Sequence, residues 1–311
     1  MVENYFKADN TAALAKKNLE NILSNGIVEK RQVGGWCMKK PKTEKIRETH
    51  AVTFELTDPR NCISSQHCLG AEVETEDYFL GLNPGYVHLS PWSFYKRWLD
   101  KNQKYHYTYG KRGGKYLWDV VKKLKENPTT RQCVVNLWKV ERDLNKSFVP
   151  CTTQWNFFIS DGKLNMVSTM RSQDACRGFF LDTFAYPIIQ QITAKRLGIP
   201  MGSYRHIVLN SHIYDDDVEF AENIINHLNK EKPVVIDNLA SDYELIMNRM
   251  SKLIFIEKDL KRAQEISENL SPFWKKWKNN QIIYVYTRDF SEQDYTTELT
   301  VAGLIVGTVM P

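Results

Sequence analysis

The chain carries a candidate nucleophile and a candidate anion-binding pair within a short stretch. Cys151 follows a proline and opens the polar and aromatic run CTTQWNFF, so its sulfur is expected at the edge of a strand. Arg171 and Ser172 follow a second predicted strand, and an arginine with a hydroxyl at a strand end suits an oxyanion such as phosphate. The same guanidinium can hold a thiolate in its ionised form. The plain alternatives are a buried structural thiol and a surface salt bridge.

A third cluster lies at the end of a later predicted strand. His212 and Tyr214 are two residues apart, which places them on the same side of a strand. Such a pair can form hydrogen bonds with sugar hydroxyls. The alternative is a half-buried pair in the core.

The order and spacing of the three clusters resemble the thymidylate synthase family. Its signature is a Pro-Cys nucleophile, then Arg-Ser-x-Asp with a glycine four residues after the aspartate, then His-x-Tyr. The matching segments here are residues 150–151, residues 171–174 with Gly178, and residues 212–214. The resemblance covers roughly residues 40–220 and is strongest over 128–215. It implies an α+β fold with a mixed sheet, flanking helices, and sheets packed across the interface of a homodimer.

Departures from the synthase pattern resemble the bacteriophage deoxycytidylate hydroxymethylases. Thr152 follows the cysteine where synthases have histidine, and Met170 stands where they have glutamine. Asp182 falls at the asparagine that reads uracil in synthases. Residues 74–78 (ETEDY) also match the E-x-E-x-Y segment of that branch, which makes Glu74 the catalytic glutamate.

The hydrogen-bonding groups of the bases support Asp182 as a reader of cytosine. Cytosine offers N4–H₂ as a donor and N3 as an acceptor. A protonated carboxyl group matches this pattern, and so does a carboxylate if N3 is protonated. The same side chain would repel O4 of uracil, and a mispaired buried polar group is costly. The alternative is that Asp182 only caps the helix that it begins.

The resemblance implies covalent catalysis with 5,10-methylenetetrahydrofolate as the one-carbon donor. The Cys151 thiolate adds to C6 of the pyrimidine, C5 takes up the one-carbon unit, and the C5 proton is removed. Loss of tetrahydrofolate leaves an exocyclic methylene, to which water adds before the cysteine is expelled. Glu74 would organise water and move protons, and Tyr109 matches a family tyrosine near the C5 proton. The implied activity is that of a deoxycytidylate 5-hydroxymethyltransferase.

The binding residues also follow from the resemblance. Arg171 and Ser172 would hold the 5′-phosphate, and His212 and Tyr214 the sugar. Arg131 matches an arginine that the family donates across the dimer, although Gln132 replaces the second arginine there. The N-terminal phosphate arginine is left open between two residues, Lys40 and Arg47. Folate contacts would come from Asp174, to the pterin, and from Trp98, for which core packing is the alternative.

Other functions remain open at this point. The protein can instead be a CMP hydroxymethylase acting on the ribonucleotide, or a C5 methylase of the thymidylate synthase type. A member of another class would be an inactive homologue that binds nucleotides or RNA.

Composition sets broad limits on the class of protein. The 311 residues are 42% hydrophobic, which is enough for a packed core, and we expect one domain over 1–311 with a core at about 40–220 and an extension at about 231–311. The net charge of +5 is a mild bias towards anionic small molecules, so no direct nucleic-acid binding is expected. Six cysteines without a CxxC pair indicate free thiols and no metal. With no signal peptide or membrane span in view, we expect a cytoplasmic protein, in the host cytoplasm if a phage encodes it.

The elements that must position these residues follow from periodicity. The sequence predicts helices over residues 10–26, 115–126, 182–197, 216–230 and 259–279, and strands over 51–56, 133–138, 155–159, 164–170, 204–214, 253–256 and 281–287. Residues 36–47 are basic, contain a proline and are predicted to form an exposed loop. Asp161-Gly162 is the predicted turn between two paired strands.

Overall fold

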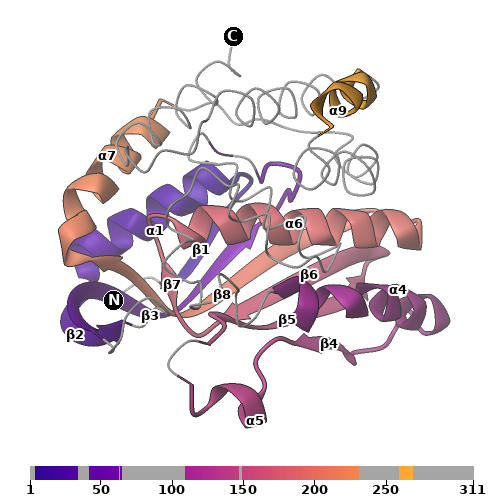
Figure 1. Ribbon diagram of the computed structural model, residues 1–311, viewed down its shortest axis with the longest axis horizontal. Helices are drawn as coiled ribbons and strands as arrows, with labels where there is room; N and C mark the ends of the chain where they lie inside the picture. Colours follow the sequence, from indigo (N-terminus) through magenta and orange to yellow (C-terminus); the bar gives the residue numbers. More distant parts are fainter. Residues whose placement is uncertain are drawn as a thin grey trace.

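The structure is a computed structural model. The structure describes residues 4–33, 42–62, 64, 109–146, 149–230 and 259–268. Within them a mixed eight-stranded sheet has the order β1-β3-β8-β6-β5-β4, with β2 paired to β3 and β7 paired to β8 (Figure 1). The strands are β1 (Tyr5–Ala8), β2 (Ile27–Val33), β3 (Lys42–Leu56), β4 (Cys133–Asn136), β5 (Thr152–Ser160), β6 (Lys163–Met170), β7 (Gln173–Asp174) and β8 (Met201–Tyr214).

Helices cover one face of this sheet. They include α1 (Thr11–Asn25), α4 (Leu117–Glu126) and α6 (Gly178–Leu197), and α6 crosses the middle of the sheet (Figure 1). The other helices are α3 (Tyr109–Arg112), η3 (Gly114–Tyr116), α5 (Val140–Asp143), η4 (Asp215–Asp217), α7 (Val218–Leu228) and α9 (Leu260–Ser267). Every residue of α6 from Phe179 to Ala194 is buried, so the helix is surrounded on all sides, and its few polar side chains, such as Asp182 and Gln190, are buried with the apolar ones. None of the described helices has the length and apolarity needed to span a bilayer.

The core lies between α6 and the sheet. Phe54 of β3 packs edge-on against Phe179 at a centroid distance of 4.9 Å, and Trp155 of β5 packs in the same way against Tyr186 at 5.5 Å. Ala263 of α9 is fully buried in the same cluster, so this part of the C-terminal stretch contributes to one common core.

The alternation of side chains along β3 changes phase at Ala51. Phe54 faces the helices, but before Ala51 it is Arg47 that reaches them, by donating to the carbonyl of Leu23 in α1 over 3.0 Å. Ala51 itself has φ +53°, in the left-handed region. Because side chains alternate with a period of two, this conformation turns Glu48 to the face opposite the helices.

The paired strand β8 changes phase at the same level. His206 packs against Phe179 of α6 at 5.8 Å, whereas Ser211 donates to Asn18 of α1 over 3.0 Å. His212 therefore shares the outer face with Glu48, its partner in the strand register.

Most of the predicted elements are confirmed. The Asn10 side chain caps α1 by accepting from the Ala13 amide over 2.8 Å, and β5 and β6 pair around the predicted turn. Gly198 ends α6 with φ +73°. The loop predicted over 36–47 is wrong from residue 42 onward, because β3 begins there and pairs with both β2 and β8. The strands predicted over 253–256 and 281–287 lie outside the described residues.

The start of α6 also differs from the prediction. The helix begins at Gly178, four residues before the expected residue 182. Asp182 therefore sits inside the helix, and its alternative role as an N-cap is wrong.

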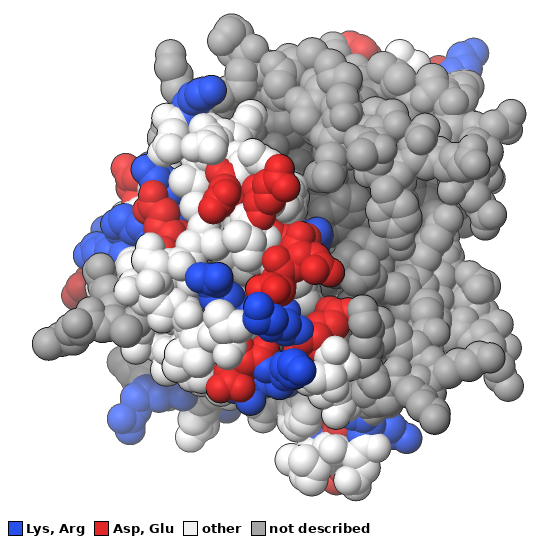
Figure 2. Space-filling view, turned by 90° about the vertical axis from the view of Figure 1, so that its left-hand side faces the viewer, with Lys and Arg blue, Asp and Glu red and all other residues white. Residues whose placement is uncertain are grey.

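The surface beside α1 and α7 carries both signs of charge. Figure 2 shows acidic and basic side chains intermixed on this face, which is at the left of Figure 1. Lys16 and Glu20 pair within α1 at 3.7 Å, and Lys45 of β3 pairs with Asp215 at 3.2 Å. Such exposed pairs contribute little to stability.

Candidate functional site

Cys151 lies directly before β5, beside the end of β6. It is not part of a disulfide and is partly exposed. Arg171, directly after β6, donates from Nε to the Pro150 carbonyl over 2.9 Å and from Nη2 to the Val149 carbonyl over 3.1 Å. The same Nη2 lies 3.7 Å from Sγ of Cys151. A guanidinium at this position stabilises a thiolate, which is the nucleophilic form of cysteine.

Tyr109 reaches the backbone of the nucleophile from α3. Its hydroxyl accepts from the amides of Cys151 at 3.2 Å and Thr152 at 3.1 Å. Burial, and then the nearby charges of Cys151 and Asp182, raise the pKa of Tyr109, so the phenol is protonated and its proton can be donated. Tyr109 thus lies within electrostatic range of both residues.

Gly113 explains how α3 comes so close to β5. A Cβ atom at this position would lie 2.4 Å from Cδ2 of Leu137 and 2.8 Å from the ring of Trp155. Since real Cβ atoms do not approach other atoms so closely, only glycine fits here without a shift. The sequence therefore needs Gly113 to bring Tyr109 over Cys151.

Asp182 is buried in the second turn of α6, with 6% of its surface exposed. Its Oδ2 accepts from Nε2 of Gln173 over 2.8 Å. Oε1 of Gln173 in turn contacts Nε2 of His206 at 2.9 Å. Nδ1 of His206 lies 2.7 Å from Oγ of Ser168 and 2.6 Å from the hydroxyl of Tyr204. A buried polar chain therefore runs from Asp182 into the core.

Thr152, the residue after the nucleophile, uses its side chain inside the core. It is fully buried, and its hydroxyl forms a hydrogen bond with that of Tyr186 in α6. This contact fixes Thr152 between strand and helix.

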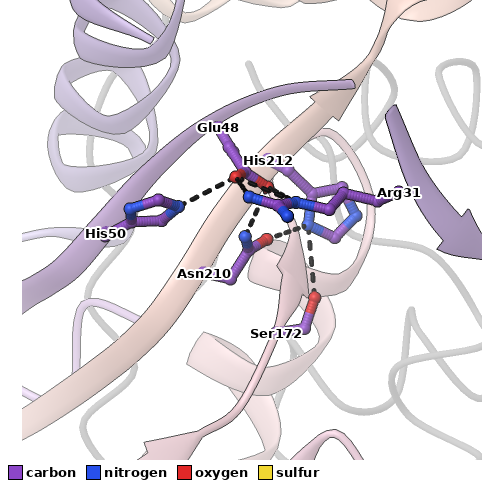
Figure 3. A network of polar contacts seen from close by, with 6 residues as sticks. All are labelled: Arg31, Glu48, His50, Ser172, Asn210 and His212. Atoms are coloured by element: carbon purple, nitrogen blue, oxygen red, sulfur yellow. Dashed lines mark hydrogen bonds and ion pairs between the residues drawn. The ribbon is translucent and has the colours of Figure 1, made fainter. Parts of the chain in front are cut away.

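The sugar-binding candidates lie at the end of β8. The rings of His212 and Tyr214 meet edge-on at 5.2 Å, so the two residues share a face as predicted. Nδ1 of His212 lies 3.0 Å from Oδ1 of Asn210 and 3.4 Å from Oγ of Ser172 (Figure 3). The phosphate and sugar candidates are therefore in contact through Ser172 and His212.

Asp174, the pterin candidate, pairs with β8 beside His212. Its Oδ1 accepts from the amides of Cys176 at 2.8 Å and Arg177 at 3.1 Å, and its Oδ2 lies 3.4 Å from Nη1 of Arg177. Arg177 makes its closer contacts with Asp217, at 2.6 and 2.8 Å. Since a carboxylate has about four acceptor positions, Asp174 retains capacity for the N–H donors of a pterin.

Arg131 does not join the other candidates within one chain. It is exposed and precedes Cys133, which pairs with Phe157 near the far end of β5. The six residues from Cys151 to Phe157 span about 20 Å along an extended strand. Within one chain, Arg131 therefore lies apart from the other phosphate candidates.

Arg47, one of the two open candidates for the N-terminal phosphate residue, makes a structural contact. Its guanidinium donates to the Leu23 carbonyl near the end of α1. The other open candidate, Lys40, lies outside the described residues, as do Glu74 and Trp98.

Sequence reasoning missed two groups of residues behind these candidates. The first is Gln173, His206, Tyr204 and Ser168, and the second is Arg31, Glu48 and Asn210. The alternation of Tyr204 and His206 on the inner side of a predicted strand is a signal for the first group. The second group depends on pairing between distant strands and has no local signal.

The comparisons with known proteins agree on one family. The protein-family model described as thymidylate synthase matches residues 85–252. A putative thymidylate synthase of Methanosarcina barkeri is 30% identical over 136 residues, which is 42% of this chain and 63% of that protein. The thymidylate synthase of Listeria monocytogenes strain HCC23 is 28% identical over 101 residues, 32% of each chain. The chain thus spans less than two thirds of the length of these relatives.

A solved structure shows the same fold. Thermostable thymidylate synthase A from Bacillus subtilis matches with a TM-score of 0.58 and 14% identity, over 73% of this chain and 86% of that one. The mixed α+β sheet with flanking helices is therefore confirmed. Because the family model matches more than half of the 311 residues, the chain belongs to the thymidylate synthase family of one-carbon transferases.

Proposed function

We propose that the protein transfers a one-carbon unit to C5 of dCMP and adds water, giving 5-hydroxymethyl-dCMP. The observation that carries this proposal is the buried carboxylate of Asp182, held by Gln173 and close to Tyr109. An acidic side chain that reads the base favours cytosine, which presents an amino group, over uracil, which presents a carbonyl.

The roles follow from the positions of the side chains. Cys151 adds through Sγ to C6, and Arg171 stabilises the thiolate that attacks. Asp182 accepts a hydrogen bond from N4 and holds the proton shared with N3. We assign the protonated Tyr109 a role at C5, which is supported by the contact of its hydroxyl with the backbone of the nucleophile. Glu74 is proposed to move protons to and from water.

Methylenetetrahydrofolate, when bound, supplies the one-carbon unit at the oxidation level of formaldehyde. Asp174 would hold the pterin, and Trp98 would stack on it. The spare acceptor capacity of Asp174 fits the N–H groups of that ring.

Product analysis tests the reaction. The chain is incubated with labelled methylenetetrahydrofolate and with dCMP, CMP or dUMP in turn. We expect hydroxymethylated dCMP together with tetrahydrofolate. Formation of dihydrofolate would instead assign C5 methylation, because only methylation takes a hydride from the folate. Absence of folate-dependent tritium release from C5 of dCMP would favour an inactive binding homologue.

We also propose that the active species is a homodimer in contact through the outer face of the sheet. The residues there are partly apolar, and Val134 and Leu209 are 43% and 50% exposed. Arg131 is too far from its own Cys151 to serve the same nucleotide. In such a dimer each Arg131 would complete the phosphate site of its partner.

Mixing two inactive variants tests the shared site. Cys151→Ala and Arg131→Ala chains are unfolded together and refolded. Random pairing should restore about a quarter of the wild-type activity, because one of the two sites in each hybrid dimer has both residues. A mixture no more active than its components would contradict the exchange of Arg131.

A further inference from the structure

The carboxylate of Glu48 is buried and ionised. Glu48 is fully buried on β3, and Arg31 of β2 donates to it from Nε at 3.1 and 3.2 Å. His50 also contacts it at 2.9 Å (Figure 3). The bonds from Arg31 lower the pKa of Glu48 to about 2 against the opposing effect of burial. At neutral pH this group can only accept hydrogen bonds.

The charge of Glu48 fixes the orientation of Asn210. The amide nitrogen of Asn210 donates to Oε2 of Glu48 over 2.6 Å. The reversed amide would place two acceptors face to face. The carbonyl oxygen of Asn210 must therefore point to His212, whose Nδ1 lies 3.0 Å away.

The orientation of Asn210 in turn fixes the proton on His212. Burial lowers the pKa of His212, so its ring is neutral and carries one N–H. Because Oδ1 of Asn210 is an acceptor, that proton must be on Nδ1. Nε2 is then the lone-pair nitrogen, and it forms no hydrogen bond with any residue in the described part of the chain.

We propose that Glu48 and Asn210 are positioning residues for His212. Through them, His212 is held as the Nδ1–H tautomer and offers Nε2 as an acceptor to the 3′-hydroxyl of the nucleotide. Arg31 acts one step further back, by keeping Glu48 ionised and in place. This role rests on the nucleotide site proposed above.

The same arrangement sets the role of Ser172. Its Oγ lies 3.4 Å from Nδ1 of His212, and with the proton on Nδ1 it can only accept in that contact. The serine keeps its own proton for another partner. A phosphate oxygen is an acceptor, so this fits the place of Ser172 beside Arg171.

A fixed acceptor at the sugar defines a class of substrate. A nucleotide with a free 3′-hydroxyl donates to Nε2 and satisfies it. A 3′-phosphate or a 3′-linked strand presents only acceptor oxygens to the lone pair and is disfavoured. The site therefore selects free 5′-mononucleotides over the same base in a polynucleotide.

Nitrogen NMR tests the tautomer without any activity measurement. The full chain is labelled with ¹⁵N-histidine, and long-range ¹H–¹⁵N correlations are recorded near neutral pH. We expect His212 to be the Nδ1–H form. Asn210→Ala should allow both tautomers, since its acceptor is gone, and Glu48→Gln should do the same because an amide at 48 can face Asn210 either way.

Glu55→Gln is the matched control. Glu55 is also a buried carboxylate on β3, and it is bound by Tyr5 and by Arg205 at 3.0 Å, without contact with His212. Its replacement should lower stability but leave the signals of His212 unchanged. If Glu48→Gln does not fold, Asn210→Ala alone decides, because Asn210 is only partly buried.

Binding then tests the consequence for substrates. Wild-type protein should bind dCMP about three- to tenfold more tightly than 2′,3′-dideoxy-CMP, the worth of one hydrogen bond. Asn210→Ala should discriminate less between the two, because a mixture of tautomers no longer offers a fixed acceptor. An Nε2–H form of His212 in the wild type, or unchanged discrimination in Asn210→Ala, would overturn the proposal. A chain that binds neither nucleotide would contradict the proposed function, and the tautomer would still decide the role of Asn210.

Discussion

The guanidinium of Arg171 donates to the carbonyls of Val149 and Pro150 and lies 3.7 Å from Sγ of Cys151. One side chain thus positions the nucleophile and provides a positive charge for its thiolate. The two functions depend on the forked shape of arginine, because separate nitrogens, Nε and Nη2, make the contacts.

Arg171→Lys should therefore slow the reaction of Cys151 with iodoacetamide. A lysine keeps the charge but has one nitrogen and cannot make all these contacts. We expect a loss of roughly fivefold in rate near neutral pH. The difference from wild type should shrink as the pH rises, because the thiol then ionises without help. Arg205→Lys, on the outer face and paired with Glu55, is the control and should leave the rate unchanged. Equal rates for wild type and Arg171→Lys would show that Arg171 does not stabilise the thiolate.

His206→Gln should flatten the dependence of stability on pH. Burial lowers the pKa of His206 to about 3, from an ordinary value of 6.5. Between these values the unfolded chain binds a proton that the folded chain does not. Stability from this group is therefore present above pH 6.5 and falls as the pH decreases, by about 1.4 kcal/mol per unit.

Urea unfolding from pH 6 to pH 4 measures this slope. His206→Gln should reduce it by about 1 kcal/mol per pH unit relative to wild type, whatever its effect on stability at pH 7. His227→Gln, at an exposed position of α7, should keep the wild-type slope. Parallel curves for wild type and His206→Gln would show that His206 takes up its proton in the folded chain.

Elements with local signals could be predicted from the sequence, and elements made by pairing could not. Helix α1 has its cap at Asn10, and the β5–β6 hairpin has its turn at Asp161, so each is specified by a few neighbouring residues. Residues 42–47 are mostly charged or polar in sequence but form part of β3, because β2 and β8 pair with its two edges. The early start of α6 has no capping side chain at Arg177 that would reveal it.

The candidate site shows the same division. Short motifs were sufficient to single out Cys151, Arg171 and His212. The side chains that orient them were not visible, since Glu48 meets Asn210 across 162 residues of sequence and Gln173 meets His206 across 33. Such contacts depend on strand register and on which face each side chain takes, and the alternation of side chains in β3 changes phase at Ala51.

Ala51→Gly should stabilise the protein. The left-handed conformation costs a residue with a Cβ about 1–2 kcal/mol, whereas glycine adopts it freely but loses more chain entropy on folding. We expect a net gain of about 0.5 kcal/mol in the free energy of unfolding, and a loss of about 1–2 kcal/mol for Ala51→Val. Chemical denaturation measures both. A stabilising Ala51→Val would mean that β3 continues without its change of phase, and Glu48 would then lose its place beside His212.

Asp182→Asn should shift the preference of the enzyme from dCMP towards dUMP. The direction of this shift follows from the contact between Asp182 and Gln173. Its Nε2 donates to Oδ2 of Asp182 over 2.8 Å, so it will take the carbonyl oxygen of an amide introduced at this position. The amide nitrogen then faces the base, where it donates to O4 of uracil and repels the amino group of cytosine. The ratio of kcat/KM for the two nucleotides, measured by tritium release from C5, should change by at least tenfold. In Asp182→Asn combined with Gln173→Leu the amide can turn either way, and the preference should weaken. If the single variant discriminates as the wild type does, Asp182 does not read the base.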